Sequence, residues 1–261
     1  KMKKSELTKD KRWEIADRLA EERLGMVNSL CQPVTPRSTL YSRFVKRAID
    51  FVIALIVLVI TLPINLVIGI ITLFDVGCPI FFKQERVGKD GNLFKIIKFR
   101  NMRDTRDENG ELLPAKERVT KFGRFVRKTS LDELLNFWSI LKGDMSLIGP
   151  RPLVPEYYQR YSNRHKMRLA VRPGLECPPR IKMNHAWSWN EQFENDVWYV
   201  ENVSFMTDCY MIFRLIQFAL DSKNSSVRAS ADRGSFMGYD LEGKAIGLGE
   251  ITEEYINSCV K

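Results

Sequence analysis

The sequence is poor in the residues that build metal centres and disulfide scaffolds. It contains only two histidines, His165 and His185, among 261 residues, and this scarcity disfavours a His-rich metal centre. The five cysteines are scattered, odd in number and never form a C-x-x-C pair. Neither a structural zinc site nor a disulfide framework is therefore expected, and a reducing compartment is favoured.

Acidic residues are the minority among the charged ones. Lys and Arg number 41 against 32 Asp and Glu, which gives a formal net charge of +9. Such a surface prefers anions, whether nucleic acid, anionic lipid or phosphorylated substrates. With 44% hydrophobic and 28% charged residues, the chain is neither wholly disordered nor a polytopic transporter. Its length allows one large domain or two small ones.

One segment lacks charge altogether. Phe51 to Phe74 carries no ionisable side chain over 24 residues, and about 20 residues suffice to cross a bilayer as a helix. It lies too far from the N-terminus, and is too long, for a cleavable signal peptide. Hydropathy alone is thus compatible with one straight transmembrane helix.

Pro63 and the flanking charges favour a re-entrant hairpin over residues 40–80 instead. Proline removes a helical hydrogen bond and disfavours a helical residue before it, so Pro63 predicts a break in the apolar run. Basic residues mark cytoplasmic membrane ends, and a hairpin that dips into one leaflet explains basic flanks on both sides. These residues are Arg43, Lys46 and Arg47 before the run, and Lys83, Arg86, Lys89, Lys95, Lys98 and Arg100 after it.

Residues 1–39 predict an amphipathic helix followed by a linker. Apolar residues recur at three- and four-residue spacing between Ser5 and Cys31, which is typical of a helix with one apolar face. The sequence leaves open whether this helix lies on a membrane, packs on its own domain or pairs with another chain. Gln32 to Ser38 then has the composition of a linker.

Residues 81–222 form the expected catalytic domain, and 223–261 a C-terminal tail. Short strands are predicted at Phe81-Phe82 and Leu93–Arg100, with a turn between them. Phe205 to Leu220 is too short and polar to span a bilayer, which leaves a core helix or an interfacial one. The glycine-rich Asp240–Gly249 is expected to be irregular. The fold class is a membrane-associated, monotopic α/β protein: a re-entrant helix hairpin plus a small, mostly helical cytosolic domain with short strands.

Ser130-Leu131-Asp132-Glu133 precedes an apolar run and predicts the start of a helix. Ser130 as N-cap and Glu133 three residues later match a capping box. A helix N-terminus also attracts phosphate and favours ionised carboxylates. Asp132 and Glu133 can therefore take separate duties as nucleophile and base, and this role is compatible with the structural one.

Gly149-Pro150-Arg151-Pro152 predicts a stiff loop, because each residue before a proline is pushed toward extended geometry. A rigidly held guanidinium suits bidentate recognition of phosphate. The alternative for Arg151 is a solvated arginine in a rigid loop.

Taken together, these motifs resemble the bacterial sugar transferase family, the small monotopic phosphoglycosyl transferases. The resemblance covers roughly Leu40 to Asp221. It rests on the order of K-R-x-x-D, the proline-containing hydrophobic segment, K-F-R-N-M, S-L-D-E-L and G-D-M-S-L-I-G-P-R-P. The family pattern R-P-G-I-T-G-x-x-Q-V differs here and becomes R-P-G-L-E-C-P-P-R-I, which begins at Arg172 and places Glu176 where the pattern has threonine.

The resemblance implies an enzyme of the bacterial inner membrane that faces the cytoplasm. It would transfer a sugar phosphate from a UDP-sugar to polyprenyl phosphate, with Mg²⁺ as cofactor and UMP as leaving group, as the first membrane step of glycoconjugate synthesis. Anionic headgroups would be a further partner, and oligomers are compatible with the family.

The same resemblance assigns individual residues. Asp132 matches the nucleophile, which forms a covalent phospho-sugar intermediate and is also the residue expected at the metal, and Glu133 matches its partner carboxylate. Arg151 matches a phosphate-binding arginine, while Arg127 and Lys98 fall at basic positions near the active site. Pro63 matches the helix-breaking proline of the hairpin.

Two other functions are compatible with parts of the sequence. An inactive relative could bind a UDP-sugar or lipid phosphate as a scaffold, although the intact Asp132-Glu133 pair disfavours this. A membrane-tethered nucleic-acid binder is suggested only by the net charge, since no recognisable nucleic-acid-binding motif interleaves aromatic with basic residues. No nucleic-acid partner is therefore expected.

Overall fold

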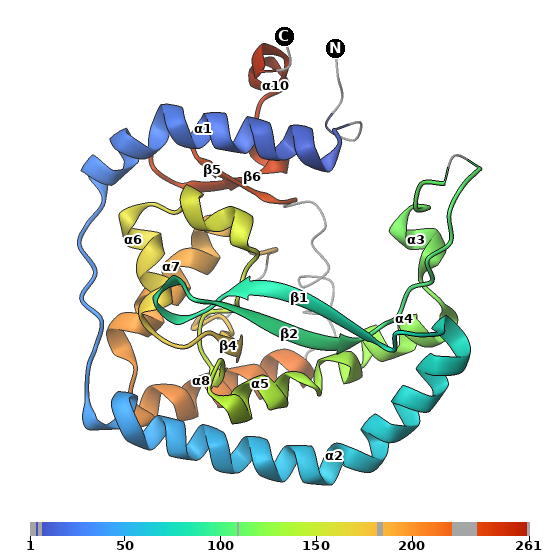
Figure 1. Ribbon diagram of the computed structural model, residues 1–261. Helices are drawn as coiled ribbons and strands as arrows, with labels where there is room; N and C mark the ends of the chain where they lie inside the picture. The colour runs from blue at the N-terminus through green and yellow to red at the C-terminus, as the bar shows by residue number, and fades with distance from the viewer. Residues whose placement is uncertain (1–3, 5–6, 109, 182–184, 221–233, 260–261) are drawn as a thin grey trace. The chain divides into compact units, whose positions relative to one another are not determined.

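A computed structural model describes residues 4, 7–108, 110–181, 185–220 and 234–259 (Figure 1). The chain divides into two compact units. We call the described part of 1–46, 87–92 and 147–261 the terminal unit, and the described part of 47–86 and 93–146 the α2 unit.

The described residues form mostly helices, with three two-stranded sheets ordered β1-β2, β3-β4 and β5-β6. The α-helices are α1 (Lys9–Leu30), α2 (Lys46–Val76), α3 (Ala115–Arg118), α4 (Lys121–Lys128), α5 (Asn136–Lys142), α6 (Asn163–Lys166), α7 (Trp189–Asn202), α8 (Phe205–Leu220) and α10 (Glu253–Cys259). The strands are β1 (Phe81–Val87), β2 (Leu93–Phe99), β3 (Ser146–Ile148), β4 (Gly174–Glu176), β5 (Phe236–Tyr239) and β6 (Ala245–Gly247). The short helical turns are η2 (Tyr41–Val45), η3 (Lys89–Gly91), η4 (Leu131–Glu133), η5 (Pro155–Arg160), η6 (Met167–Ala170) and η8 (Leu248–Glu250).

In the terminal unit, α1 packs on the β5-β6 hairpin, so the N-terminal and C-terminal segments lie side by side (Figure 1). The buried face of α1 carries Ile15, Ala16 and Leu19, which join Met237 and Ile246 in one apolar cluster. Of the three possibilities for the predicted N-terminal helix, the structure therefore has packing on the helix's own domain. The prediction that residues 240–249 are irregular was wrong, since β6 and η8 begin within this range.

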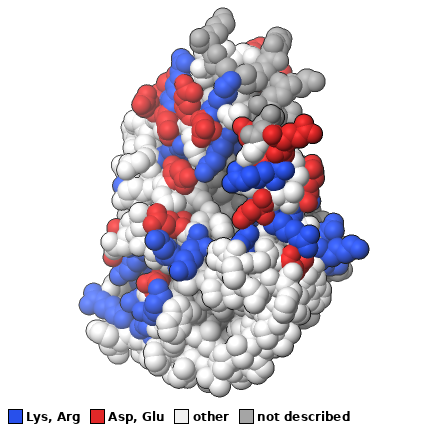
Figure 2. Space-filling view, turned by 45° about the vertical axis from the view of Figure 1, so that its right-hand side comes forward, with Lys and Arg blue, Asp and Glu red and all other residues white. Residues whose placement is uncertain are grey.

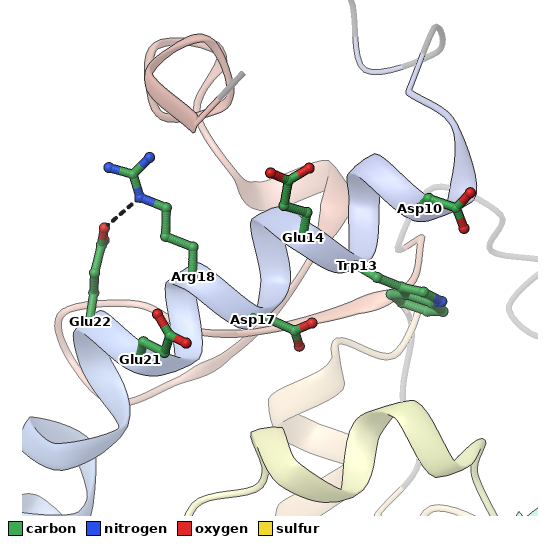
Figure 3. A pocket seen from close by; sticks show the side chains of 7 residues that line it. All are labelled: Asp10, Trp13, Glu14, Asp17, Arg18, Glu21 and Glu22. Atoms are coloured by element: carbon green, nitrogen blue, oxygen red, sulfur yellow. Dashed lines mark hydrogen bonds and ion pairs between the residues drawn. The ribbon is translucent and has the colours of Figure 1, made fainter. Parts of the chain in front are cut away.

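A second edge of α1 faces η5. Trp13 packs edge-on against Tyr157, with ring centroids 5.7 Å apart, and the buried Arg160 donates from Nε to Asp17 at 2.8 Å. Figure 3 shows Trp13 and Asp17 on this side of α1, with Glu14 and Arg18 directed away from it. The charged side chains of α1 thus lie on two sides of the helix: Asp17 contacts η5, while Arg18 and Glu22 make hydrogen bonds to Ser258 and Tyr255 of α10.

In the α2 unit, the apolar segment forms one helix. α2 continues through Pro63 and bends along its length (Figure 1), so the structure does not show the predicted hairpin. Proline removes one backbone donor, and side-chain hydrogen bonds that bend helices occur in the same turn. Thr61 Oγ1 donates to the Val57 carbonyl at 2.7 Å, and Asn65 Nδ2 donates to Thr61 Oγ1 at 3.2 Å.

The outer surface of α2 is apolar and exposed. Figure 2 shows a broad area without charged side chains where α2 runs, with Lys and Arg along its edge. The opposite face is buried and contains Asp50, Ala54, Gly69 and Thr72. α2 is long and apolar enough to cross a membrane by length and composition, and an exposed apolar surface of this extent marks contact with lipid or another partner.

The predicted strands and the apolar helix are confirmed. β1 and β2 form the expected hairpin with η3 at its turn, and α8 spans Phe205–Leu220. α8 buries Met211 and Asp208 but leaves Phe205 and Phe213 more than half exposed. It is therefore neither a fully buried core helix nor a solvated one.

Candidate active site

Three predicted site residues lie together in the α2 unit. β2 supplies Lys98, and η4, which packs against β2 and α4, supplies Asp132 and Glu133. Lys98 Nζ donates to Glu133 Oε1 at 2.6 Å, and both side chains are less than a quarter exposed. A lysine and two carboxylates thus share a site with little surrounding water, where charge interactions are stronger than at an open surface.

The turn that carries these carboxylates differs from the predicted capping box. Ser130 has φ 57° and ψ 19°, which is left-handed, and its side chain caps no helix. It ends α4 instead, since its N–H donates to the Arg127 carbonyl at 3.2 Å. Asp132 therefore lies in a short 3₁₀ turn, while α5 begins only at Asn136. The prediction of a capping box was wrong, because the end of α4 determines the conformation of Ser130.

Asp132 is buried, with 6% of its surface exposed. Burial raises the pKa of its carboxyl, an effect that the positive charge of Lys98 opposes and the negative charge of Glu133 reinforces. Arg127, in the last turn of α4, also acts through its charge and lowers this pKa. The arrangement gives a carboxylate that is more basic than usual and has two cations nearby, a combination suited to attack on a phosphorus atom.

Arg151 lies in the terminal unit, in the loop after β3. Its Nη1 donates to the Leu175 carbonyl at 3.2 Å and to Glu176 Oε2 at 3.0 Å. Gly149 and Gly174 bring the two segments together, since a Cβ on either would collide with the backbone of the other. The predicted stiff loop is thus held against β4.

A buried ion pair supports this loop from within the terminal unit. Arg168 and Asp196 are each 1% exposed and are joined by two hydrogen bonds, of 2.7 and 3.0 Å. Arg168 Nη2 also donates to the carbonyl of Arg151 at 2.8 Å. Sequence reasoning missed this pair and also Glu176, although a carboxylate in place of the pattern's threonine was a visible signal for Glu176.

Asp132 and Glu133 offer the hard oxygen ligands that Mg²⁺ prefers. Among the described residues, no group of three or more His, Cys, Asp and Glu side chains could hold a metal ion. Mg²⁺ is often held by one or two carboxylates together with phosphate oxygens and water. The two carboxylates therefore fit a Mg²⁺ ion that shares its ligands with a phosphate, and do not form a complete protein site.

Comparison with known proteins identifies the family. The family model described as "Bacterial sugar transferase" matches residues 41–222. The uncharacterized sugar transferase EpsL of Bacillus subtilis (strain 168) is 42% identical over 178 residues, which are 68% of this chain and 88% of that protein.

Two longer relatives carry more specific names. The UDP-galactose-lipid carrier transferase of Erwinia amylovora is 34% identical, and the undecaprenyl-phosphate galactose phosphotransferase of Salmonella typhimurium is 33% identical. Each match covers 69% of this chain and 41% of the relative, so the chain spans less than half the length of these two proteins. By its family match and by these relatives, the chain belongs to the bacterial sugar transferase family.

Proposed function

We propose that the protein transfers a sugar phosphate from a UDP-sugar to polyprenyl phosphate and releases UMP, at the cytoplasmic face of the bacterial inner membrane. The observation that carries the proposal is the buried carboxylate of Asp132, next to a second carboxylate and Lys98, in a member of the sugar transferase family. The names of the Erwinia and Salmonella relatives support a lipid phosphate acceptor and a galactose-type donor.

In the first step, an oxygen of Asp132 attacks the phosphorus that bears the sugar. A bond forms between this oxygen and phosphorus, and the bond from phosphorus to the bridging oxygen breaks, so that UMP leaves with the electron pair. The product is a mixed anhydride between the carboxyl of Asp132 and the sugar phosphate. Covalent catalysis of this kind divides one difficult displacement into two easier ones. The raised pKa of Asp132 favours it, because a more basic carboxylate is a better nucleophile.

In the second step, an oxygen of the lipid phosphate attacks the same phosphorus and displaces the carboxylate of Asp132. Glu133 would accept the proton of a lipid phosphate that arrives protonated, and Lys98 would hold Glu133 in place through their 2.6 Å hydrogen bond. Arg151 would bind a substrate phosphate. Mg²⁺, held by Asp132 and phosphate oxygens, would supply positive charge that offsets the charge of the phosphoryl groups.

The ends of α2 support entry and exit on one side of the membrane. Arg47, in its first turn, donates to the carbonyls of Ile140 and Leu141 at 2.6 and 2.7 Å. At the other end, Arg103 donates to the backbone and side chain of Asp75 at 2.9 and 3.2 Å. Both ends are therefore attached by polar contacts to the same unit, which cannot lie on both sides of a bilayer. A re-entrant path with its turning point near Pro63 agrees with these attachments.

The test is a reaction without acceptor. The full-length protein, Mg²⁺ and each of a panel of UDP-sugars, without polyprenyl phosphate, should release UMP in an amount limited by the enzyme. Intact-mass measurement should then find a phospho-sugar adduct on the peptide that contains Asp132. Asp132→Asn should abolish both, because an amide is a poor nucleophile. Glu133→Gln should retain adduct formation in part and lose transfer to undecaprenyl phosphate.

Two results would contradict the proposal in different ways. Normal turnover with both substrates but no adduct would favour direct transfer, and Asp132 would then serve the metal alone. UDP-sugar binding without UMP release under any condition would instead favour the scaffold function.

A further inference from the structure

Arg151 is already bound to a carboxylate of its own chain. Its Nη1 lies 3.0 Å from Glu176 Oε2, and the other oxygen, Oε1, accepts from the N–H of Cys177 at 3.3 Å. Both side chains of the ion pair remain partly exposed, at 39% for Arg151 and 30% for Glu176. A soluble anion can therefore reach the guanidinium, but it meets a negative charge there.

The backbone on both sides of this ion pair is fixed. Gly149, which follows β3, and Gly174, which begins β4, bring the two backbones into close contact, and the fully buried Arg168 donates to the carbonyl of Arg151. Glu176 ends β4, directly after the residue whose carbonyl also accepts from Arg151. The pair is thus a product of the sheet geometry and differs from a chance meeting of two flexible side chains.

We propose that Glu176 is an internal counter-anion that a substrate phosphate must displace from Arg151, so that Glu176 sets the affinity of the site for its phosphorylated ligand. This inference rests on the proposed role of Arg151 as a phosphate ligand. Carboxylate and phosphate oxygens compete for the same N–H groups of a guanidinium. A partly exposed ion pair contributes little stability, so a phosphate with more charge can replace the carboxylate.

The competition depends on the charge of Glu176, whose Oε2 accepts from Arg151 Nη1. A neutral side chain at this position would leave the guanidinium without a competing carboxylate. We therefore expect this chain to bind its phosphorylated ligand more weakly than the same chain with a neutral residue at this position.

Binding of UDP and of inorganic pyrophosphate to the full-length protein in lipid nanodiscs tests the inference, with calorimetry as readout. Glu176→Gln and Glu176→Thr should each bind both probes about three- to tenfold more tightly than the unchanged protein. Glu242→Gln is the matched control, because it removes the same charge from the exposed ion pair with Lys244 in the same unit. It should leave both affinities unchanged.

A double variant isolates the pair. In the Arg151→Gln background, Glu176→Gln should no longer tighten binding, since the competition needs the guanidinium. Unchanged or weaker binding in both Glu176 variants would overturn the inference and make Glu176 a structural partner of Arg151. Absence of binding by either probe to any variant would also overturn it, because Arg151 would then be no phosphate ligand.

UMP release separates this inference from the proposed function. Tighter UDP binding in the Glu176 variants, with no UMP release from any UDP-sugar, would support the counter-anion and contradict the transferase activity. Normal UMP release, with the same KM in the Glu176 variants and the unchanged protein, would support the transferase activity and contradict the counter-anion. If the counter-anion and the transferase activity are both correct, the Glu176 variants should lower KM for the UDP-sugar.

Discussion

The carboxyl of Asp132 lies at a position where the fold has removed most of the surrounding water. Burial raises the pKa of its carboxyl in the folded protein above the ordinary value of about 3.9, which also describes the unfolded chain. The folded state therefore binds a proton at Asp132 more tightly than the unfolded state does. Stability should fall as the pH rises from the ordinary range of an aspartate through the folded pKa, and the loss persists at neutral pH.

Asp132→Asn should remove the loss of folding stability that the buried carboxyl causes at neutral pH. We expect a gain of about 0.5–2 kcal/mol at pH 7, in the range of other stability–function trade-offs, and a rise of Tm by a few degrees. The gain should shrink toward pH 4, where the aspartate is increasingly protonated in both states. Thermal unfolding of both proteins over this pH range is the measurement.

Asp104→Asn is the control, because the Asp104 side chain is 67% exposed and pairs with Arg100 in the same unit. It should change Tm little at any pH. A lower Tm for Asp132→Asn at pH 7 would mean that the carboxylate of Asp132 stabilises the folded state, which would contradict this prediction.

Ser130 illustrates a limit of sequence reasoning at the scale of one residue. The motifs drew attention to Asp132, Glu133 and Lys98, and the structure brings these three residues together. Sequence reasoning misassigned Ser130, since a serine can begin one helix or follow the end of another, and only the tertiary path of α4 decides between them. The left-handed conformation that results costs a non-glycine residue about 1–2 kcal/mol.

At the scale of elements, α1 depends on its contact with β5. Leu19 is 1% exposed and lies over Gly238, whose φ of 143° and missing Cβ leave room for it. Leu19→Ala should lower the free energy of unfolding by about 2–5 kcal/mol, because it leaves a cavity between helix and hairpin. Met26→Ala on the same helix is the control, since Met26 is 37% exposed. Denaturant unfolding should separate the two variants.

The result also tells whether the helix packs on its own unit in solution. An equal effect of both substitutions, or no effect of either, would favour the alternatives that the sequence left open, a membrane surface or another chain.

The proposed path of α2 predicts that the residues before and after it lie on the same side of the membrane. Cys31 precedes α2 and Cys78 follows it, and both are at least partly exposed. A membrane-impermeant maleimide should modify both thiols in inside-out vesicles and neither in spheroplasts, with peptide mass spectrometry as readout. The buried Cys177 should stay unmodified in both and serves as the internal control.

Modification of Cys31 and Cys78 from opposite sides of the membrane would instead mean that α2 spans the bilayer. Pro63→Ala returns the missing backbone donor and is the variant expected to increase such opposite-side modification.

The sequence was a good guide to elements whose pattern is local. The β1-β2 hairpin and α8 follow from alternating and continuous apolar residues, and the structure has both. Pro63 was a weaker guide, because a proline can bend a helix without ending it, and α2 continues through Pro63. The β5-β6 hairpin was missed because its glycines were taken as a sign of irregular structure.

At the scale of the whole molecule, the net charge of +9 predicts attraction to anionic lipid. Each basic residue near such a surface contributes about 1 kcal/mol, so two of them already give more than tenfold tighter binding. Sedimentation with vesicles should find this preference for phosphatidylglycerol over phosphatidylcholine at 0.05 M salt. It should largely vanish at 0.5 M, where charges are screened within a few ångströms. If the preference for phosphatidylglycerol did not change with salt concentration, the excess Lys and Arg residues would not be near the lipid surface.

The polar attachments at the two ends of α2 also bear on how the protein reaches its membrane. A spanning helix requires machinery that carries hydrophilic residues through the bilayer. A helix bound at Arg47 and Asp75 to one folded unit requires only that its exposed apolar side enter a leaflet. No hydrophilic part of the α2 unit then has to be exported. A completed chain, released from the ribosome and already folded, should therefore be able to insert into empty liposomes without a translocon.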